Sequence, residues 1–535
     1  MSYLLVCTVV ILLCVLVSRL THKLGVPVLL AFIALGMLFG ENGIFRIPFD
    51  NYQLSEQICT IALIFIMFYG GFGTNWDEAK PVAIKAAVLA SLGVVLTAAL
   101  TGAVCILFLK LPVLDAMLLG AILSSTDAAS VFSVLRSKKL GLRENTASLL
   151  EVESGSNDPF AYMLTITLLS VMSGSSSGTQ LLWLTMKQLL FGILFGVAIA
   201  LLVREFLRHY HFPVPGFDMA FFIGIALLSY ALPAALGGNG YLSAYIVGII
   251  LGNCRIRKKK SLVHFFDGFT SLMQMLIFFL LGLLATPARI PQILIPAIII
   301  ALLLTFVVRP LAVTICLTPL GCSIRQQLLV SFAGLRGAAS IVFAIMATVH
   351  EAQTSGDLFH MVFCIVLLSI AFQGSLLAPV ARWLGMCDQS IDDAKSFSDY
   401  TDQVKLYFIN LEIYDGHSWE GKPLHEINLP PDMLVIMLLR NGENVLQGGD
   451  TIFHPGDSVI LSAPAYQDEV GLALQEKSIT QNSPWVGKTI AAFSPKKEEL
   501  VVMILRGEQT IIPNGDTTIE AGDVLVISEK KMSVL

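Results

Sequence analysis

The chain is dominated by hydrophobic runs that are long enough to cross a lipid bilayer. A bilayer core about 30 Å thick requires about 20 apolar residues in a helix, and about thirteen such runs follow one another between Tyr3 and Met386. The whole sequence is 55% hydrophobic and only 14% charged, which is more apolar than a soluble core requires. These features predict a polytopic α-helical membrane protein, with about 13 transmembrane helices, in the cell membrane.

The charges in the loops between these runs predict how the chain is oriented. Lys and Arg are concentrated in alternate loops, for example in residues 136–143 and 255–260, whereas the intervening loops carry few charges. Because basic loops remain in the cytoplasm, this alternation places the N-terminus outside and the C-terminus inside the cell. Arg19 and Lys23 follow the first run and no basic residue precedes it, so we expect a retained first helix.

An odd number of spans allows two inverted halves joined by one connecting helix. With span seven as the connector, spans one to six correspond to spans eight to thirteen, and span five corresponds to span twelve. Span five is interrupted by the polar sequence 124–127, and span twelve by small residues around Arg336. Interrupted helices at corresponding positions are typical of a transporter's binding site, so we predict inverted repeats with two broken crossing helices.

Acidic side chains at membrane depth are the strongest functional signal in the sequence. A charge there costs roughly 2.5 to 3.5 kcal/mol on insertion scales, and it therefore marks an ion or proton pathway. Ser154 and Asp158 lie four positions apart on one helix face, as do Glu153 and Asn157. Carboxylate, hydroxyl and carbonyl oxygens suit a hard cation, so we predict that an ion and a proton compete for Asp158.

Asp127 permits two interpretations at the predicted break of span five. Its carboxylate can cap the following half-helix and oppose the positive end of that helix dipole, or it can contact an ion. The two roles are compatible. Thr126, beside it, can offer both its hydroxyl and its carbonyl to a cation.

Glu153 needs a positive partner to remain ionised at membrane depth. The mid-membrane cations are Arg309 and Arg336. We predict a Glu153–Arg309 ion pair and place Arg336 at the carboxyl ends of the broken span twelve. All three are expected to be structural, because removing one member of a buried pair strands the other charge.

From about Asp388 the sequence changes to that of a soluble protein. Short β-branched runs alternate with Gly, Asp and Pro turns, which predicts a small α+β module. Trp419 returns as Trp485 and Arg440 as Arg506, each 66 positions later, so two copies of one unit are expected to pack together. The predicted domains are a membrane domain at 1–387, a linker at 388–403, and repeats at 404–475 and 476–535.

Several other functions lack support. The net charge of −5 offers no clustered basic face for nucleic acid. The nine Cys are scattered, without a Cys-x-x-Cys pair, and fit small buried apolar positions better than metal ligands. Gly487-Lys488-Thr489 looks like the end of a phosphate-binding loop, but Asn482 stands where the first Gly of that loop is required. We expect no cofactor and no metal beyond a transported monovalent cation.

Together, Thr126-Asp127-Ala128-Ala129, the segment 153–159, Arg309-Pro310 and Gly334-Leu335-Arg336-Gly337 resemble the NhaP-like branch of the cation:proton antiporter superfamily. The resemblance implies a homodimer, thirteen helices in inverted repeats, and electroneutral exchange of Na⁺ or K⁺ for H⁺. It assigns ion and proton binding to Asp158, Asp127, Thr126, Ser154 and Asn157, and a structural ion pair to Glu153 and Arg309. Some relatives carry an acidic residue near the end of helix three, but residues 69–75 contain none, so no ligand is assigned there.

The soluble repeat resembles two copies of the TrkA-C domain, the C-terminal part of regulators of potassium conductance. This resemblance implies regulation from the cytosol and favours K⁺ as the ion. It also implies a small effector, for which a nucleotide such as cyclic di-AMP is one hypothesis.

Two functions from other classes remain as alternatives. A ligand-gated monovalent cation channel would need a continuous pore with a filter, and no repeated carbonyl-rich loop of that kind is present. An intramembrane enzyme would need Asp127 and Asp158 close enough to share a proton, and the sequence does not determine that distance. The prediction is therefore a transporter and not an enzyme.

Overall fold

A computed structural model describes most of the chain as two compact units, Met1–Thr401 and Asp402–Leu535. The described residues are 3–24, 27–41, 43–137, 140–174, 178–210, 212, 216–254, 256, 259–350, 357–388, 406–430, 433–440, 443–445, 448–464, 472–481, 483–492, 499–506, 509–511 and 513–530. The predicted linker, 388–403, lies outside them except for Asp388, as do parts of both basic loops used above.

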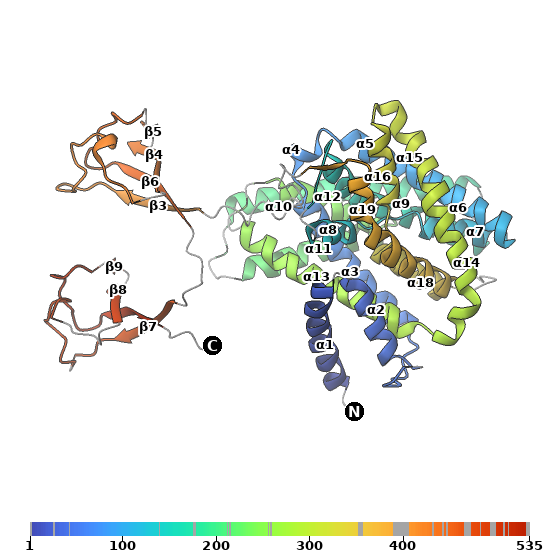
Figure 1. The fold of residues 1–535 in the computed structure, drawn as a ribbon, viewed down its shortest axis with the longest axis horizontal. Coiled ribbons are helices and arrows are strands. Elements are labelled where there is room, and N and C mark those ends of the chain that lie inside the picture. Colours follow the sequence, from blue (N-terminus) through green and yellow to red (C-terminus); the bar gives the residue numbers. More distant parts are fainter. Residues whose placement is uncertain are drawn as a thin grey trace. The chain divides into compact units, whose positions relative to one another are not determined.

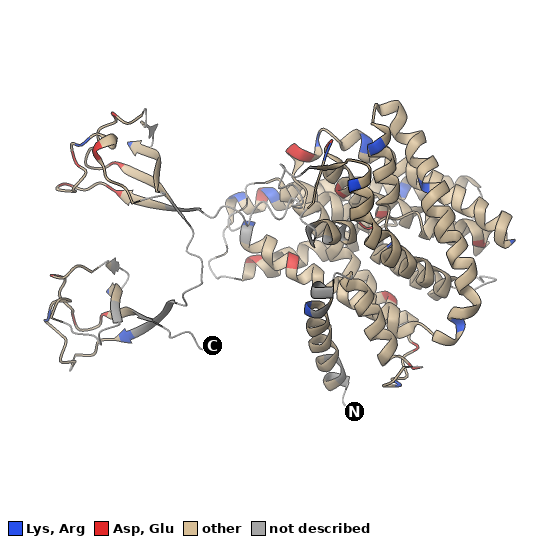
Figure 2. Cartoon of the chain, viewed as in Figure 1, with Lys and Arg blue, Asp and Glu red and all other residues tan. Residues whose placement is uncertain are grey.

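The first unit is a bundle of apolar helices (Figure 1). Within its described residues, seven helical stretches are long and apolar enough to cross a membrane, and five shorter apolar helices accompany them. Charged side chains are sparse along these helices (Figure 2), and the prediction of a polytopic helical membrane fold is confirmed. The helices are α1 (Tyr3–Leu24), α2 (Val28–Phe39), α3 (Tyr52–Gly73), α4 (Trp76–Ala79), α5 (Ala83–Val88), α6 (Val94–Leu109), α7 (Val113–Ile122), α8 (Ala128–Ser137), α9 (Thr146–Met172), α10 (Gly178–His209), α11 (Phe217–Ala235), α12 (Gly240–Gly252), α13 (Lys259–Leu284), α14 (Ile290–Leu303), α15 (Arg309–Leu317), α16 (Ile324–Phe332), α17 (Ala338–Val349), α18 (Leu358–Leu368) and α19 (Gly374–Trp383).

Two of the apolar runs are interrupted where the sequence predicted. Non-helical backbone separates α7 from α8 around residues 124–127, and α16 from α17 around residues 334–337. Each interruption contains polar or small residues, which satisfy exposed backbone groups or permit close packing more readily than large apolar residues do. The bundle therefore contains two broken helices.

Three other runs stay helical but contain a π-helical turn. These turns are η1 (Leu89–Gly93) between α5 and α6, η3 (Leu304–Val308) between α14 and α15, and η5 (Ser369–Gln373) between α18 and α19. A π-helical turn inserts an extra residue into a helix and is frequent at functional sites.

Two close helix crossings rest on glycine. Gly36 of α2 packs against Gly282 of α13, and Gly71 of α3 packs against Gly248 of α12. A Cβ atom at Gly36 would lie 2.2 Å from the backbone oxygen of Phe279, so only glycine permits this approach. Small residues allow membrane helices to come close enough for strong van der Waals packing.

The second unit contains two four-stranded antiparallel sheets with the same topology. The strand orders are β3-β6-β4-β5 and β7-β10-β8-β9. Each sheet has its own apolar core. Among the described residues of this unit, helical structure is limited to the 3₁₀ turn Leu424–Glu426. The strands are β3 (Leu406–Glu412), β4 (Leu434–Arg440), β5 (Glu443–Asn444), β6 (Ser458–Pro464), β7 (Leu472–Ser478), β8 (Glu499–Arg506), β9 (Gln509–Ile511) and β10 (Val524–Lys530), while β1 (Gly141–Leu142) and β2 (Cys387–Asp388) pair in the first unit.

Candidate functional site

The two broken helices meet at their interruptions. The amide of Asp127 donates to the carbonyl of Leu335 at 2.9 Å, and Nη1 of Arg336 donates to the carbonyl of Ser125 at 2.7 Å. The hydroxyl of Ser340 donates to the carbonyl of Ile122 at 2.9 Å. Backbone groups released by one break are thus satisfied by the other, as the membrane interior requires.

Asp158 lies beside this crossing, in the middle of α9. Its side chain is buried, and its carboxylate accepts a hydrogen bond from the hydroxyl of Ser125. Ser125 was not singled out from the sequence, although it belongs to the polar interruption that predicted the site. A buried carboxylate that receives a hydroxyl hydrogen bond is suited to exchanging a proton for a cation.

Three other predicted residues surround the same point. The hydroxyl of Ser154 donates to the carbonyl of Thr126 at 2.6 Å. The side-chain nitrogen of Asn157 donates to the hydroxyl of Thr126 at 2.5 Å. The side-chain oxygen of Asn157 accepts from the backbone amide of Thr126 at 3.3 Å. All three side chains are buried. They bind α9 to the first break and bring hydroxyl, carbonyl and carboxylate oxygens together.

Asp127 caps α8. Its carboxylate accepts from the backbone amide of Ser130 at 3.3 Å and from the Ser130 hydroxyl at 2.6 Å. A Cβ atom at Gly337 would lie 2.1 Å from Oδ2 of Asp127, so glycine is needed where the second break passes this carboxylate. The cap satisfies amides at a positive helix end, while contact of Asp127 with an ion stays a prediction.

Glu153 and Arg309 form a buried ion pair, with exposed side-chain fractions of 1% and 2%. The expectation for Arg336 was wrong. Its guanidinium reaches the carbonyl of Ser125 in the first break rather than the carboxyl ends of the second broken helix, and it makes no ion pair within the described part of the chain. The reason is that the two breaks cross, which brings a carbonyl from the other broken helix within reach.

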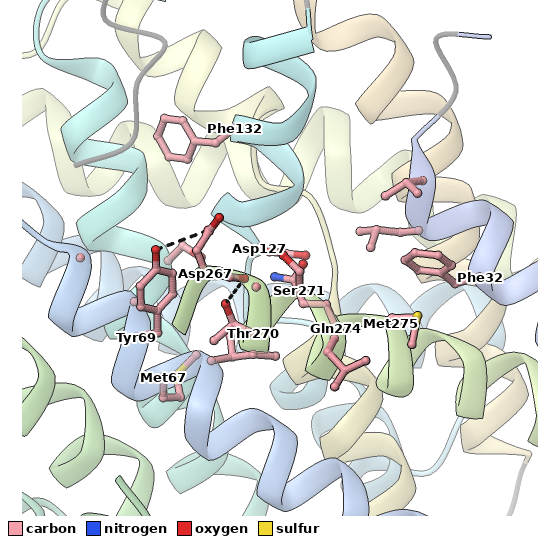
Figure 3. A pocket seen from close by; sticks show the side chains of 18 of the residues that line it. Phe32, Met67, Tyr69, Asp127, Phe132, Asp267, Thr270, Ser271, Gln274 and Met275 are labelled. Carbon is pink, nitrogen blue, oxygen red and sulfur yellow. Dashed lines mark hydrogen bonds between the residues drawn. The ribbon is translucent and has the colours of Figure 1, made fainter. Parts of the chain in front are cut away.

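A cavity of about 540 Å³ leads to this site (Figure 3). Its walls come from α1, α2, α3, α8, α9 and α13, and Asp158, Asp127 and Ser154 lie in its lining. Asp267 of α13 also lines it, where the hydroxyl of Tyr69 donates to the carboxylate at 3.4 Å. Glu151 is another acidic lining residue. Neither acid was singled out, although a carboxylate inside an apolar run was a usable signal.

No group of three or more His, Cys, Asp or Glu side chains among the described residues could hold a metal ion. The oxygen set around Asp158 has one carboxylate with hydroxyl and carbonyl groups. Such a set is suited to a weakly held monovalent cation that enters and leaves as a substrate.

A membrane-helix bundle in which two broken helices cross beside a buried carboxylate defines a secondary transporter. The model of the transmembrane sodium/hydrogen exchanger family matches residues 8–383. The chain therefore belongs to the sodium/hydrogen exchanger family. The TrkA-C domain matches twice, at residues 409–466 and 474–531, so the predicted tandem repeat is confirmed.

Similar proteins agree with this assignment. The K(+)/H(+) antiporter NhaP of Alkalimonas amylolytica is 33% identical over 85% of this chain and 80% of its own length. The K(+)/H(+) antiporter NhaP2 of Shewanella baltica is 32% identical over 87% of this chain and 79% of its own length. The structure of the sodium proton antiporter MjNhaP1 from Methanocaldococcus jannaschii at pH 8 matches the fold, with a TM-score of 0.63 and 24% identity, covering 70% of this chain and 97% of that protein. The predicted NhaP-like family with a TrkA-C region is confirmed.

Proposed function

We propose that the protein is a secondary-active antiporter that exchanges K⁺ (or Na⁺) for H⁺ across the cell membrane. The observation that carries this proposal is the buried Asp158 carboxylate in the lining of a cavity and beside two crossed helix breaks. A carboxylate that is empty and charged is costly in the membrane interior. Only the form occupied by a proton or a cation crosses the barrier, so the two substrates exchange by competition.

The charges at the crossing support electroneutral exchange. Asp158, Asp127 and Glu153 contribute three carboxylates, and Arg309 and Arg336 contribute two guanidinium groups. With every group ionised, the net charge of this set is −1. One monovalent cation or one proton neutralises it, which favours exchange of one ion for one proton.

The ion and proton are held by Asp158, with Asp127, Thr126, Ser154 and Asn157 as the supporting set. The hydroxyl of Ser154 donates to the Thr126 carbonyl, and a cation would compete for that oxygen. Glu153 and Arg309 form the scaffold ion pair.

K⁺ is the favoured cation because both NhaP relatives described above are named K(+)/H(+) antiporters. A ligand-gated channel is the weaker alternative, since the described residues around the site form no ring of filter carbonyls. Transport that dissipates a K⁺ gradient without moving protons would favour the channel.

The chain crosses the bilayer thirteen times in two inverted repeats, with the N-terminus outside and the C-terminus in the cytoplasm. The glycine crossings support the repeats, because Gly36 with Gly282 and Gly248 with Gly71 occupy spans that correspond when span seven is the connector. The cavity is lined by ends of α3, α9 and α13 that adjoin basic loops. By the positive-inside rule, it opens to the cytoplasm.

The membrane domain, 1–387, is joined by the linker 388–403 to regulatory repeats at 404–475 and 476–535. The two compact units and the two TrkA-C matches support this division. The repeats regulate exchange in response to a small effector, with cyclic di-AMP as the first compound to test. The working molecule is a homodimer.

The test is the Asp158→Asn variant, reconstituted in liposomes with a pH-sensitive dye and titrated with K⁺, Na⁺ and Li⁺. An amide cannot exchange a proton at neutral pH, so we expect cation-dependent proton movement to fall to the level of empty liposomes. An imposed membrane potential should leave the wild-type rate unchanged, because one charge replaces one charge.

Asp77→Asn is the matched control, because Asp77 is exposed in the first turn of α4, outside the site. It should transport like the wild type. Exchange retained by Asp158→Asn would remove Asp158 from the mechanism, and a rate driven by the membrane potential would overturn electroneutrality.

A further inference from the structure

Each helix break separates a backbone carbonyl from the amide four residues later, at equivalent positions in the two breaks. In a continuous α-helix the amide of one residue donates to the carbonyl four residues earlier. The first break separates the Ile122 carbonyl from the Thr126 amide, and the second separates the Phe332 carbonyl from the Arg336 amide. Unpaired backbone groups cost several kcal/mol in a membrane, so each must find another partner.

In the first break the substitutes come from two helices. The hydroxyl of Ser340 donates to the Ile122 carbonyl at 2.9 Å, and the side-chain oxygen of Asn157 accepts from the Thr126 amide at 3.3 Å. Asn157 lies in the helix that follows the broken one. It is already part of the proposed ion site.

In the second break two side chains form a complete bridge. The Arg336 amide donates to the Ser369 hydroxyl at 3.0 Å. That hydroxyl donates to Oε1 of Gln373, and Nε2 of Gln373 donates to the Phe332 carbonyl at 3.3 Å. Three hydrogen bonds thereby replace the helical bond between the Arg336 amide and the Phe332 carbonyl.

The bridge is built on η5, the π-helical turn that begins at Ser369 and ends at Gln373. Both side chains are buried, with exposed fractions of 3% and 7%. The extra residue of a π-helical turn changes the direction of the side chains at its two ends. Here that change brings both polar groups toward the break, from a helical stretch that is mostly apolar.

The segment held by this bridge contacts the ion site directly. Leu335 accepts from the Asp127 amide, and the Arg336 side chain binds the carbonyl of Ser125, whose hydroxyl donates to Asp158. If residues 332–336 closed into a continuous helix, these contacts would be lost.

We propose that Ser369 and Gln373 are positioning residues for the ion site, and that they act by holding the second helix break open. This inference rests on the proposed exchange at Asp158. In the second inverted half, Ser369 accepts the hydrogen bond of the Arg336 amide. Asn157 accepts the hydrogen bond of the Thr126 amide in the same way in the first half.

The experiment compares Ser369→Val with Ser369→Thr. The two replacement side chains have nearly the same shape, and only Thr keeps the hydroxyl. At equal amounts of folded protein in liposomes, we expect the half-saturating K⁺ concentration of Ser369→Val to rise by about tenfold, the effect of losing a buried hydrogen bond, with changed selectivity among K⁺, Na⁺ and Li⁺. Ser369→Thr should stay within about threefold of the wild type.

Gln373→Met provides the second variant, with Gln188→Met as its matched control. Gln188 is also a buried glutamine in a long membrane helix, but its side chain has no hydrogen-bond partner within the described residues. Gln373→Met should raise the half-saturating concentration as Ser369→Val does, and Gln188→Met should not.

A purely structural role would lower the amount of folded protein and the maximal rate while the half-saturating concentration stays constant. That result overturns the proposal. Hydrogen exchange at the Arg336 amide gives a readout independent of transport, because it should differ between Ser369→Val and Ser369→Thr. Identical hydrogen-exchange rates in the two variants would overturn the proposed bridge, even if the protein transports ions. A wild-type protein that does not exchange cations for protons would overturn only the proposed function.

Discussion

At the scale of single residues, the site contains buried charges whose free-energy cost is offset by a partner. The Glu153–Arg309 pair is almost completely removed from solvent, and each member neutralises the other. Asp158 has instead a neutral hydroxyl donor in Ser125. The pair is therefore suited to a permanent scaffold, and Asp158 to a changing occupant.

The scaffold role predicts a large loss of stability for Glu153→Gln. This change strands the Arg309 charge, and we expect a loss of about 3 to 5 kcal/mol, measured by thermal unfolding of the detergent-solubilised protein. The double variant Glu153→Gln with Arg309→Met should recover part of that loss, because no unpaired charge remains.

The control is Glu205→Gln, which breaks the exposed Arg208–Glu205 pair, whose side chains are 69% and 53% exposed. Exposed pairs contribute about 0 to 1 kcal/mol, so this variant should unfold near the wild-type temperature. Equal unfolding temperatures for Glu153→Gln and Glu205→Gln would contradict the scaffold role.

At the scale of elements, close packing of helices sets the frame that holds the breaks. The α3–α12 crossing brings the backbones together at Gly71 and Gly248, and α12 and α3 also border the helix that carries Asp158. Such contacts leave no space for additional atoms, because the interior of a helix bundle is packed to crystal-like density.

Gly248→Ala should therefore destabilise the helical unit. A Cβ atom at this position would lie 2.2 Å from the backbone oxygen of Phe68, and relief requires the helices to separate. We expect a loss of about 1 to 3 kcal/mol, seen as a lower unfolding temperature.

Gly224→Ala in α11 is the matched change, because a Cβ atom there meets nothing within 4 Å. It should be neutral or slightly stabilising, since alanine favours helix. If both alanine variants behave alike, the crossing does not depend on glycine.

At the scale of the whole molecule, the two units have separate cores and different sources of stability. The membrane unit is built on large apolar clusters, whereas each TrkA-C repeat has a small core and one repeated ion pair. Arg440 binds Asp457 through two hydrogen bonds of 2.7 Å, and Arg506 binds Asp523 at 2.8 and 2.9 Å.

These pairs predict that acid destabilises the TrkA-C unit. The Arg440 hydrogen bonds lower the pKa of Asp457 below its ordinary value of 3.8, and Arg506 does the same to the pKa of Asp523. A lowered carboxyl pKa stabilises the fold at pH values above 3.8, and that stability is lost as the pH falls through the lowered value. Hydrogen exchange in β6 and β10 of the full-length protein, corrected for intrinsic rates, should therefore accelerate below about pH 4.

Replacing both Asp457 and Asp523 by Asn should accelerate this exchange already at neutral pH and weaken its dependence on acid. Asp516→Asn, at an exposed turn, is the control and should keep the wild-type profile. An unchanged acid response in the double variant would show that other groups control it.

The sequence alone determined the membrane character of residues 3–386, the two helix breaks, the tandem repeat, and the residues Asp158, Thr126, Ser154 and Asn157 that meet at the crossing. These features are local, because spans, interruptions and repeats depend on the hydrophobicity and order of neighbouring residues. Only the tertiary structure decided that Arg336 binds the carbonyl of Ser125, that the Ser125 hydroxyl binds Asp158, and that Ser369 and Gln373 bridge the second break. Those partners come from different helices, and their distances follow from how the helices pack, which no local pattern in the sequence encodes.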